Sequence, residues 1–190
     1  TTAWMDGVFN SQVVLGNTSM NKWITNTRNP LNILKTSGQR IYVQINDQWK
    51  LLAMPSVFEI GNHYVKWIYQ LEDDVLEVLT YTLADSNTIK LVVKSEANKE
   101  YPYLITQQVI MNEAENRSGY AYDVKDNLIE FKAVEPSIIN HVMPDLRFYL
   151  NVETNGGAFS VTDETELLEG LAEAGQEAEL FILKVEKTAD

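Results

Sequence analysis

Alternation of apolar and polar side chains across residues 64–111 predicts four consecutive strands separated by short polar breaks. The clearest segment is 64–71, where apolar residues occupy the odd positions, the side-chain period of two that a half-buried strand requires. The segment 75–83 has apolar residues at both odd and even positions. This predicts a central strand that is covered on both faces for part of its length. Polar residues 85–87 then close a hairpin with the next strand. With a fourth strand over 103–111, we predict that these segments form the spine of one antiparallel sheet.

Shorter alternating segments flank this spine on both sides. Polar residues 46–48 predict a hairpin between two of them, Pro55 ends the pairing that follows, and two glycines at 156–157 permit the turn that ends another strand. Residues 112–126 contain few apolar anchors and are expected to form a long surface loop. Residues 186–190 should fray. The strands predicted outside the spine are 40–45, 49–52, 129–133, 148–152 and 181–185.

Residues 162–174 alone have the pattern of a helix. Asp163 and Glu166 lie at capping-box spacing, leucines three and four residues apart make an apolar stripe, and Gly175 can end the helix. About ten strands with this one helix near the C-terminus predict an all-β fold, an antiparallel β-sandwich in which two sheets pack face to face.

Length and composition narrow the class of protein. The 190 residues fit a single domain, 1–190, that buries about 70 per cent of the surface of its unfolded chain. The absence of cysteine excludes a disulfide framework and favours a reducing compartment, the cytoplasm. A net charge of −12 makes nucleic acid and anionic membranes unexpected partners, and no apolar run is long enough to span a membrane. The chain has no initiator Met, which fits a fragment of a larger multidomain protein and equally fits a processed terminus.

Carboxamide side chains are dense near the start of the chain. Each amide both donates and accepts hydrogen bonds, as the binding of sugar hydroxyls requires, but amides also cap turns, and the sequence leaves both roles open. An arginine follows this segment, and its five fixed donors suit a carboxylate or carbonyl cluster across an interface. The candidate carbohydrate-facing or interface-facing residues are Asn10, Gln12, Asn17, Asn21 and Arg28.

Catalytic motifs are not found. The two histidines, His63 and His141, lack metal-ligand spacing, so no metal site is expected, and neither a nucleophile elbow nor a phosphate loop occurs. A sugar mutarotase needs one His and one Glu around the sugar ring, and either histidine with Glu59 or Glu135 could supply the pair. A carbohydrate-binding module would need exposed aromatic platforms, yet Trp67 in its alternating strand fits a core residue better.

Five segments of the chain together carry a family likeness. They read MDGVFNS (5–11), GNTSMNK (16–22), GQRIYV (38–43), PSVFEI (55–60) and WIY (67–69). These segments resemble the β-sandwich region that precedes the catalytic helical barrel in phosphorylases of glycoside hydrolase family 94, and are nearest to the 1,2-β-oligoglucan (sophorooligosaccharide) phosphorylases. The likeness extends to about residue 109.

The resemblance implies a galactose-mutarotase-like supersandwich fold. It also implies a parent enzyme, a glycosyltransferase-type phosphorylase, that cleaves β-linked gluco-oligosaccharides with inorganic phosphate and inversion, without a metal or organic cofactor. The catalytic groups of that family lie in the helical barrel, for which this chain has no helical repeat, so the domain alone is expected to be non-catalytic. It would pack on the barrel of the same polypeptide and shape its cleft, with oligosaccharide near the interface. The alternatives are a mutarotase-like enzyme and a stand-alone carbohydrate-binding module.

Overall fold

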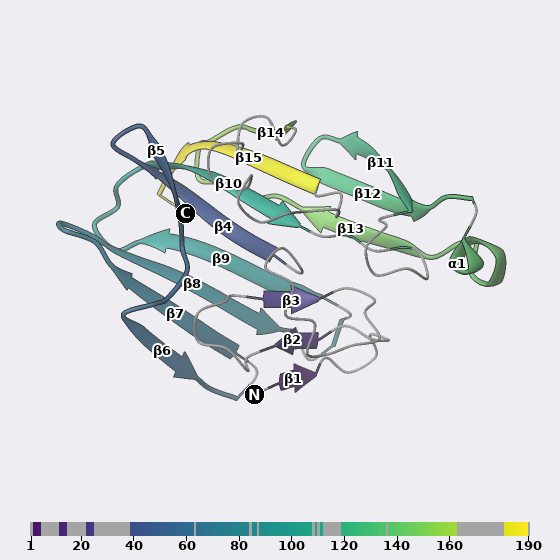
Figure 1. The fold of residues 1–190 in the computed structure, drawn as a ribbon, viewed down its shortest axis with the longest axis horizontal. Coiled ribbons are helices and arrows are strands. Elements are labelled where there is room, and N and C mark those ends of the chain that lie inside the picture. The colour runs from purple at the N-terminus through teal and green to yellow at the C-terminus, as the bar shows by residue number, and fades with distance from the viewer. Residues whose placement is uncertain are drawn as a thin grey trace.

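In the computed structural model, the described part of the chain consists mainly of antiparallel strands (Figure 1). The structure describes residues 2–4, 12–14, 22–24, 39–62, 64–83, 85–86, 88–107, 109, 111, 119–135, 137–162 and 181–189. For residues 2–4, 12–14, 22–24, 82 and 139 it describes only the backbone.

These residues form fifteen strands in four sheets, with one short helix, α1 (Ile138–Val142). The five-stranded sheet has the order β14 (Phe159–Thr162), β15 (Phe181–Thr188), β10 (Tyr101–Gln107), β4 (Gln39–Ile45) and β5 (Gln48–Leu51). The four-stranded sheet has the order β6 (Val57–Ile60), β7 (Tyr64–Gln70), β8 (Val75–Thr82) and β9 (Ile89–Ser95). One three-stranded sheet comprises β11 (Tyr120–Lys125), β12 (Leu128–Ala133) and β13 (Arg147–Asn151), and the other comprises β1 (Thr2–Trp4), β2 (Gln12–Val14) and β3 (Lys22–Ile24).

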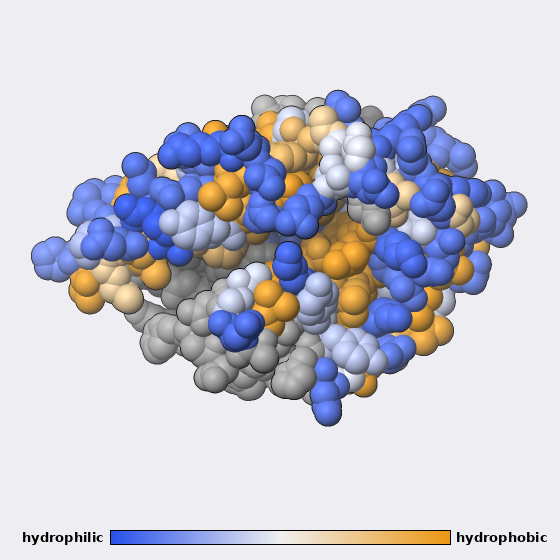
Figure 2. Space-filling view, turned by 180° about the vertical axis from the view of Figure 1, so that it is seen from behind, coloured by the Kyte–Doolittle hydropathy of each residue, from blue (hydrophilic) through white to orange (hydrophobic). Residues whose placement is uncertain are grey.

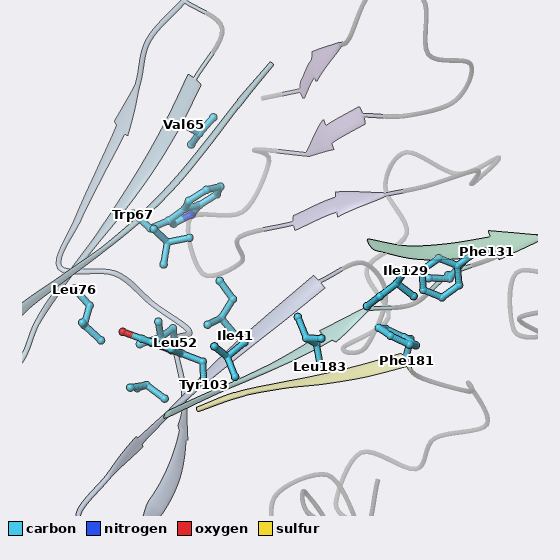
Figure 3. Packing of buried hydrophobic residues seen from close by; sticks show 14 of the residues in the cluster. Ile41, Leu52, Val65, Trp67, Leu76, Tyr103, Ile129, Phe131, Phe181 and Leu183 are labelled. Carbon is cyan, nitrogen blue, oxygen red and sulfur yellow. The ribbon is translucent and has the colours of Figure 1, made fainter. Parts of the chain in front are cut away.

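Buried side chains from three of these sheets pack into one shared core. Trp67 of the four-stranded sheet belongs to the same buried cluster as Ile41 and Leu183 of the five-stranded sheet (Figure 3). Phe131 of β12 meets Phe181 of β15 edge to face, with ring centroids 4.9 Å apart. Each of these buried side chains stabilises the fold by roughly 1.5–3 kcal/mol. The predicted antiparallel β-sandwich is therefore confirmed.

The predicted spine is divided between two sheets. Strands β7, β8 and β9 pair consecutively as expected, but β10 leaves them and lies between β4 and β15. The prediction of one sheet is wrong on this point, because the residues that pair with β10 lie far away in the sequence. Tyr103, for example, is opposite both Val43 and Val185.

Two loop predictions are also wrong. Strand β11 occupies 120–125, which was expected to be loop, because Tyr120, Tyr122 and Val124 supply a short apolar alternation. The chain end does not fray at Glu186, since β15 continues to Thr188 and that side chain is buried. Pairing with β10 holds these residues in the sheet.

The predicted helix over 162–174 falls, except for Thr162, outside the described residues. Thr162 itself ends strand β14. The described helix, α1, lies elsewhere, between β12 and β13. No helix in the described part of the chain is long and apolar enough to cross a membrane.

Asp74 closes one end of the sandwich. Its carboxylate is 4 % exposed and accepts hydrogen bonds from Ser95 Oγ at 2.7 Å and Tyr101 OH at 2.9 Å. It also accepts from the backbone N–H groups of Val75 and Ala97. These partners lie on β8, at the end of β9, in the turn that follows β9, and at the start of β10, so one carboxylate holds the two large sheets together where the chain crosses between them.

The surroundings of Asp74 shift two pKa values. Burial acts to raise the pKa of Asp74, but the four hydrogen bonds outweigh it and the pKa is lowered. Burial, followed by the hydrogen bond to Asp74, raises the pKa of Tyr101 to about 12. Asp74 is therefore ionised and Tyr101 is protonated at neutral pH.

Candidate functional site

A hollow lies between two edge strands of the sandwich. Strand β11 is the outer strand of its three-stranded sheet and β14 is the outer strand of the five-stranded sheet. A groove of about 720 Å³ runs between them and continues along the segment that connects β13 to β14. We call it the open-edge groove. Its lining includes Tyr122, Val124, Asp126, Glu153, Phe159 and Val161.

The apolar lining of the groove comes from the inner faces of the two outer strands. Tyr122 is paired with the fully buried Phe131, so both side chains lie on the same face of their sheet. Phe159 and Val161 are paired in the same way with buried residues of β15. Alternation therefore directs these side chains toward the core, but Tyr122, on a strand at the edge of its sheet, is still 48 % exposed.

Neighbouring rings fix the orientation of Tyr122. Its ring meets Phe181 edge to face, with centroids 5.3 Å apart, and lies 6.1 Å from the ring of Phe131. Tyr120 lies on its other side at 6.5 Å. Aromatic pairs prefer such tilted and edge-to-face arrangements, so the groove presents a ring whose position is already set.

Polar groups form the rim. The tight turn between β11 and β12 contains Asp126, whose φ of 53° is a left-handed conformation that Asp tolerates. The segment after β13 lies beside this turn, since the Val152 N–H donates to the carbonyl of Asn127 at 2.8 Å. There Glu153 accepts a hydrogen bond from Asn151 Nδ2 at 3.0 Å, and the Thr154 hydroxyl donates to the carbonyl of Gly157. None of the described lining residues is Lys or Arg. The rim therefore offers carboxylates, an amide and hydroxyls without positive charge.

One face of the molecule is mainly hydrophilic. In Figure 2 hydrophilic residues cover much of this face, and apolar residues are seen in a depression near its centre.

The residues singled out from the sequence are mostly not tested. Asn10, Asn17, Asn21 and Arg28 lie outside the described residues, and of Gln12 only the backbone, in β2, is described. Their assignment as carbohydrate-facing or interface-facing stays a prediction. The open-edge groove is formed by other parts of the chain.

The residues of the possible mutarotase pairs are only partly described. His63 lies outside them, and His141 is exposed on α1. Glu59 accepts a hydrogen bond from the Tyr64 hydroxyl, and Glu135 accepts one from Asn140 Nδ2 at 2.8 Å. Neither glutamate lines the open-edge groove.

Two further features of the described residues bear on ligand binding. The part of the chain that the structure describes contains no group of three His, Cys, Asp or Glu residues placed to hold a metal ion. Trp67 is fully buried and faces the core, which confirms that it is not a sugar platform.

The sequence contains a local signal for both edge strands of the groove. The alternation of Tyr120, Tyr122 and Val124 predicts a strand, but the polar residues before and after it favoured a loop. Phe159 and Val161 show the same period in a strand of four residues. No local pattern indicated that β11 and β14 would lie across from each other.

Comparison with known proteins places the chain in a family. The family model described as the glycoside phosphorylase supersandwich domain matches residues 1–190. The 1,2-beta-oligoglucan phosphorylase of Listeria innocua serovar 6a is 39% identical over 163 residues, which cover 86% of this chain. The chain spans 15% of the length of that relative. The observed sandwich is consistent with this match. The chain therefore belongs to the glycoside phosphorylase supersandwich domains.

Proposed function

We propose that this chain acts as a non-catalytic domain of a larger cytoplasmic phosphorylase, one that cleaves β-linked gluco-oligosaccharides with inorganic phosphate. The observation that carries the proposal is the family match over all 190 residues, together with a relative of which this chain represents only 15%. The remainder of such a polypeptide would supply the catalytic helical barrel. The role of this domain is then to pack on the barrel and shape one wall of its cleft.

The chemistry of the described residues supports a non-catalytic role. Phosphorolysis with inversion needs a carboxylic acid to protonate the leaving oxygen and a site that holds phosphate. The open-edge groove has carboxylates but, among its described lining residues, no cation to hold phosphate. A separate domain of the polypeptide would then supply the cationic groups that hold phosphate.

An exposed apolar surface around α1 supports packing against another part of the polypeptide. Val142 and Met143 are 66 % and 55 % exposed, and Ile138 on the same short helix is also exposed. These three residues are close together in the sequence, and clustered exposed apolar side chains commonly mark an interface. A neighbouring domain seated on α1 would remove these side chains from water.

The proposal is tested by assaying phosphorolysis with two proteins: the complete polypeptide encoded by the gene, and residues 1–190 alone. The complete polypeptide should release glucose 1-phosphate from β-1,2-linked gluco-oligosaccharides in the presence of phosphate. Residues 1–190 should neither do so nor speed the mutarotation of α-glucose. Turnover by residues 1–190 alone, or none by the complete polypeptide, contradicts the proposal.

Arg28 is the residue we propose to contact the barrel. Replacing it with Ala in the complete polypeptide should lower the rate of phosphorolysis about tenfold, roughly 1.4 kcal/mol in the barrier. The melting temperature of residues 1–190 should be almost unchanged. If that temperature falls while the rate is kept, Arg28 forms a local ion pair within this domain and does not reach the barrel.

A further inference from the structure

We propose that the open-edge groove binds a neutral gluco-oligosaccharide chain, away from any catalytic cleft. The choice of glucan rests on the proposed function, whereas the existence of the site rests on the geometry of β11, β14 and the segment between β13 and β14.

The first argument is that apolar side chains on inner faces of the sandwich remain exposed to water at the groove. Tyr122, Val124 and Phe159 all point from inner faces toward the space between two sheets, where most residues of that orientation are buried. Keeping apolar surface in water is unfavourable by about 25 cal/mol per Å². A half-exposed ring in a concave site with polar groups at its rim is the usual form of a ligand site.

The second argument is the chemistry of the lining, which suits a sugar. A β-linked glucose unit has an apolar face of C–H groups and a ring of hydroxyls. Tyr122 and Phe159 offer aromatic surface to the C–H groups, and hydroxyls can donate to the carboxylates of Asp126 and Glu153. Asn127 can both donate and accept, which completes the match to a ligand whose hydroxyls do the same.

The third argument concerns which ligands the groove disfavours. Anionic ligands meet two carboxylates with no Lys or Arg among the described lining residues. A basic peptide would satisfy the carboxylates, but it would leave the amide and hydroxyls of the rim without a specific role. The volume of about 720 Å³ is within the range of small-molecule sites and suits a short chain of sugar rings.

The site is tested with the complete polypeptide and a β-1,2-linked glucose tetramer as the probe. Amide hydrogen exchange is followed on β11 and on residues 152–158, which report on the groove independently of phosphorolysis. We expect the tetramer to slow exchange in these two segments. In the Tyr122→Ala protein the tetramer concentration that gives half of this protection should rise about tenfold, a typical loss for an aromatic anchor.

Tyr149→Ala is the matched control. Tyr149 lies on β13 of the same sheet and is also 48 % exposed, but it does not line the groove. This variant should bind the tetramer like the wild type. Equal losses in the two variants, or no protection of the groove by the tetramer in the wild type, overturn the inference.

A second variant keeps the inference testable if Tyr122→Ala does not fold. Asp126→Asn with Glu153→Gln keeps the shape of the rim and the turn, since Asn also tolerates the left-handed conformation of residue 126. It should weaken protection by the tetramer severalfold, with little dependence on salt. If the groove instead binds a polylysine probe in a salt-dependent manner and not the tetramer, the ligand is a cation and the inference is wrong.

The outcome is separable from that of the proposed function. Phosphorolysis without protection of the groove overturns the inference alone. Protection of the groove without phosphorolysis overturns the proposed function alone. Groove amides that are already fully protected without sugar would show that another part of the polypeptide fills the groove, and the inference would fail.

Discussion

Trp67 and Tyr122 are aromatic residues on inner faces of neighbouring sheets, yet one is fully buried and the other is 48 % exposed. Each belongs to a strand with clear apolar alternation. The difference lies in the position of the strand: β7 has β6 and β8 on its two sides, whereas β11 is the outer strand of its sheet. Burial of an inner-face residue thus depends on what lies beside and across from its strand.

The two ends of the sandwich differ in the same way. Near Asp74, the crossover from β9 to β10 and the four hydrogen bonds of one carboxylate keep the sheets closed. Between β11 and β14 no such link is found among the described residues, and a groove remains. We therefore expect the closed end to contribute more to the stability of the fold, and the open edge to be available for binding a ligand.

The largest effect is expected for Trp67→Ala. Deleting this buried ring should lower the free energy of unfolding by about 3–5 kcal/mol, because a cavity is left in the core. The measurement is urea denaturation of the variant and the wild type. A loss below roughly 1 kcal/mol would mean that Trp67 is not enclosed, and the contrast with Tyr122 would disappear.

Trp67→Phe provides the control for this substitution. The indole Nε1 of Trp67 is buried and meets no hydrogen-bond acceptor in the described structure, so its removal breaks no hydrogen bond there. The loss should therefore be smaller, about 1–2 kcal/mol, and should reflect volume alone.

The next effect is expected for Asp74→Ala, at about 2–4 kcal/mol. The substitution leaves the Ser95 and Tyr101 hydroxyls and two backbone N–H groups without their acceptor. Asp73→Ala is the matched control one residue away, since Asp73 is exposed and pairs with Lys99 Nζ at 2.6 Å. An exposed ion pair contributes only about 0–1 kcal/mol, so similar losses in the two variants would argue against closure by Asp74.

The pH dependence of unfolding tests the same carboxylate without changing the core. The pKa of Asp74 is lower in the folded protein than in the unfolded chain, where it is about 3.9. The stabilisation is therefore fully present above that value and is lost as the pH falls through the folded pKa, below about pH 4. Urea denaturation between about pH 3 and pH 6 should show a steeper loss for the wild type than for Asp74→Asn. Parallel curves would contradict the assignment.

The smallest effect is expected for Tyr122→Ala. This variant loses ring contacts with Phe181 and Phe131 but removes little buried surface, so the loss should be about 1–2 kcal/mol. Thermal and urea unfolding measure it beside Tyr149→Ala, which should lie within about 0.5 kcal/mol of the wild type. A loss as large as that of Trp67→Ala would show that the open edge carries as much stability as the core.

The sequence by itself determined the fold class and most individual strands. The alternation at 64–71 and at 129–133 is imposed by the two-residue period of an extended backbone, and both segments are strands as predicted. Turn chemistry was equally local: Asn46 and Asp47 both take positive φ in the predicted hairpin, and Gly156 does so after β13. These features depend on residues that are close together in the chain.

Only the tertiary structure decided which strands became neighbours and which inner faces stayed open. Strand β10 pairs with β4 and β15, and Tyr122 of β11 packs on Phe181 of β15, across sequence separations that no local pattern encodes. The candidate groove followed from that arrangement, while the amide-rich segment favoured by the sequence stays a prediction. The physical reason is that alternation specifies which face of a strand is apolar, whereas the cover over that face is supplied by distant parts of the chain whose pairing is settled only when the sheets pack.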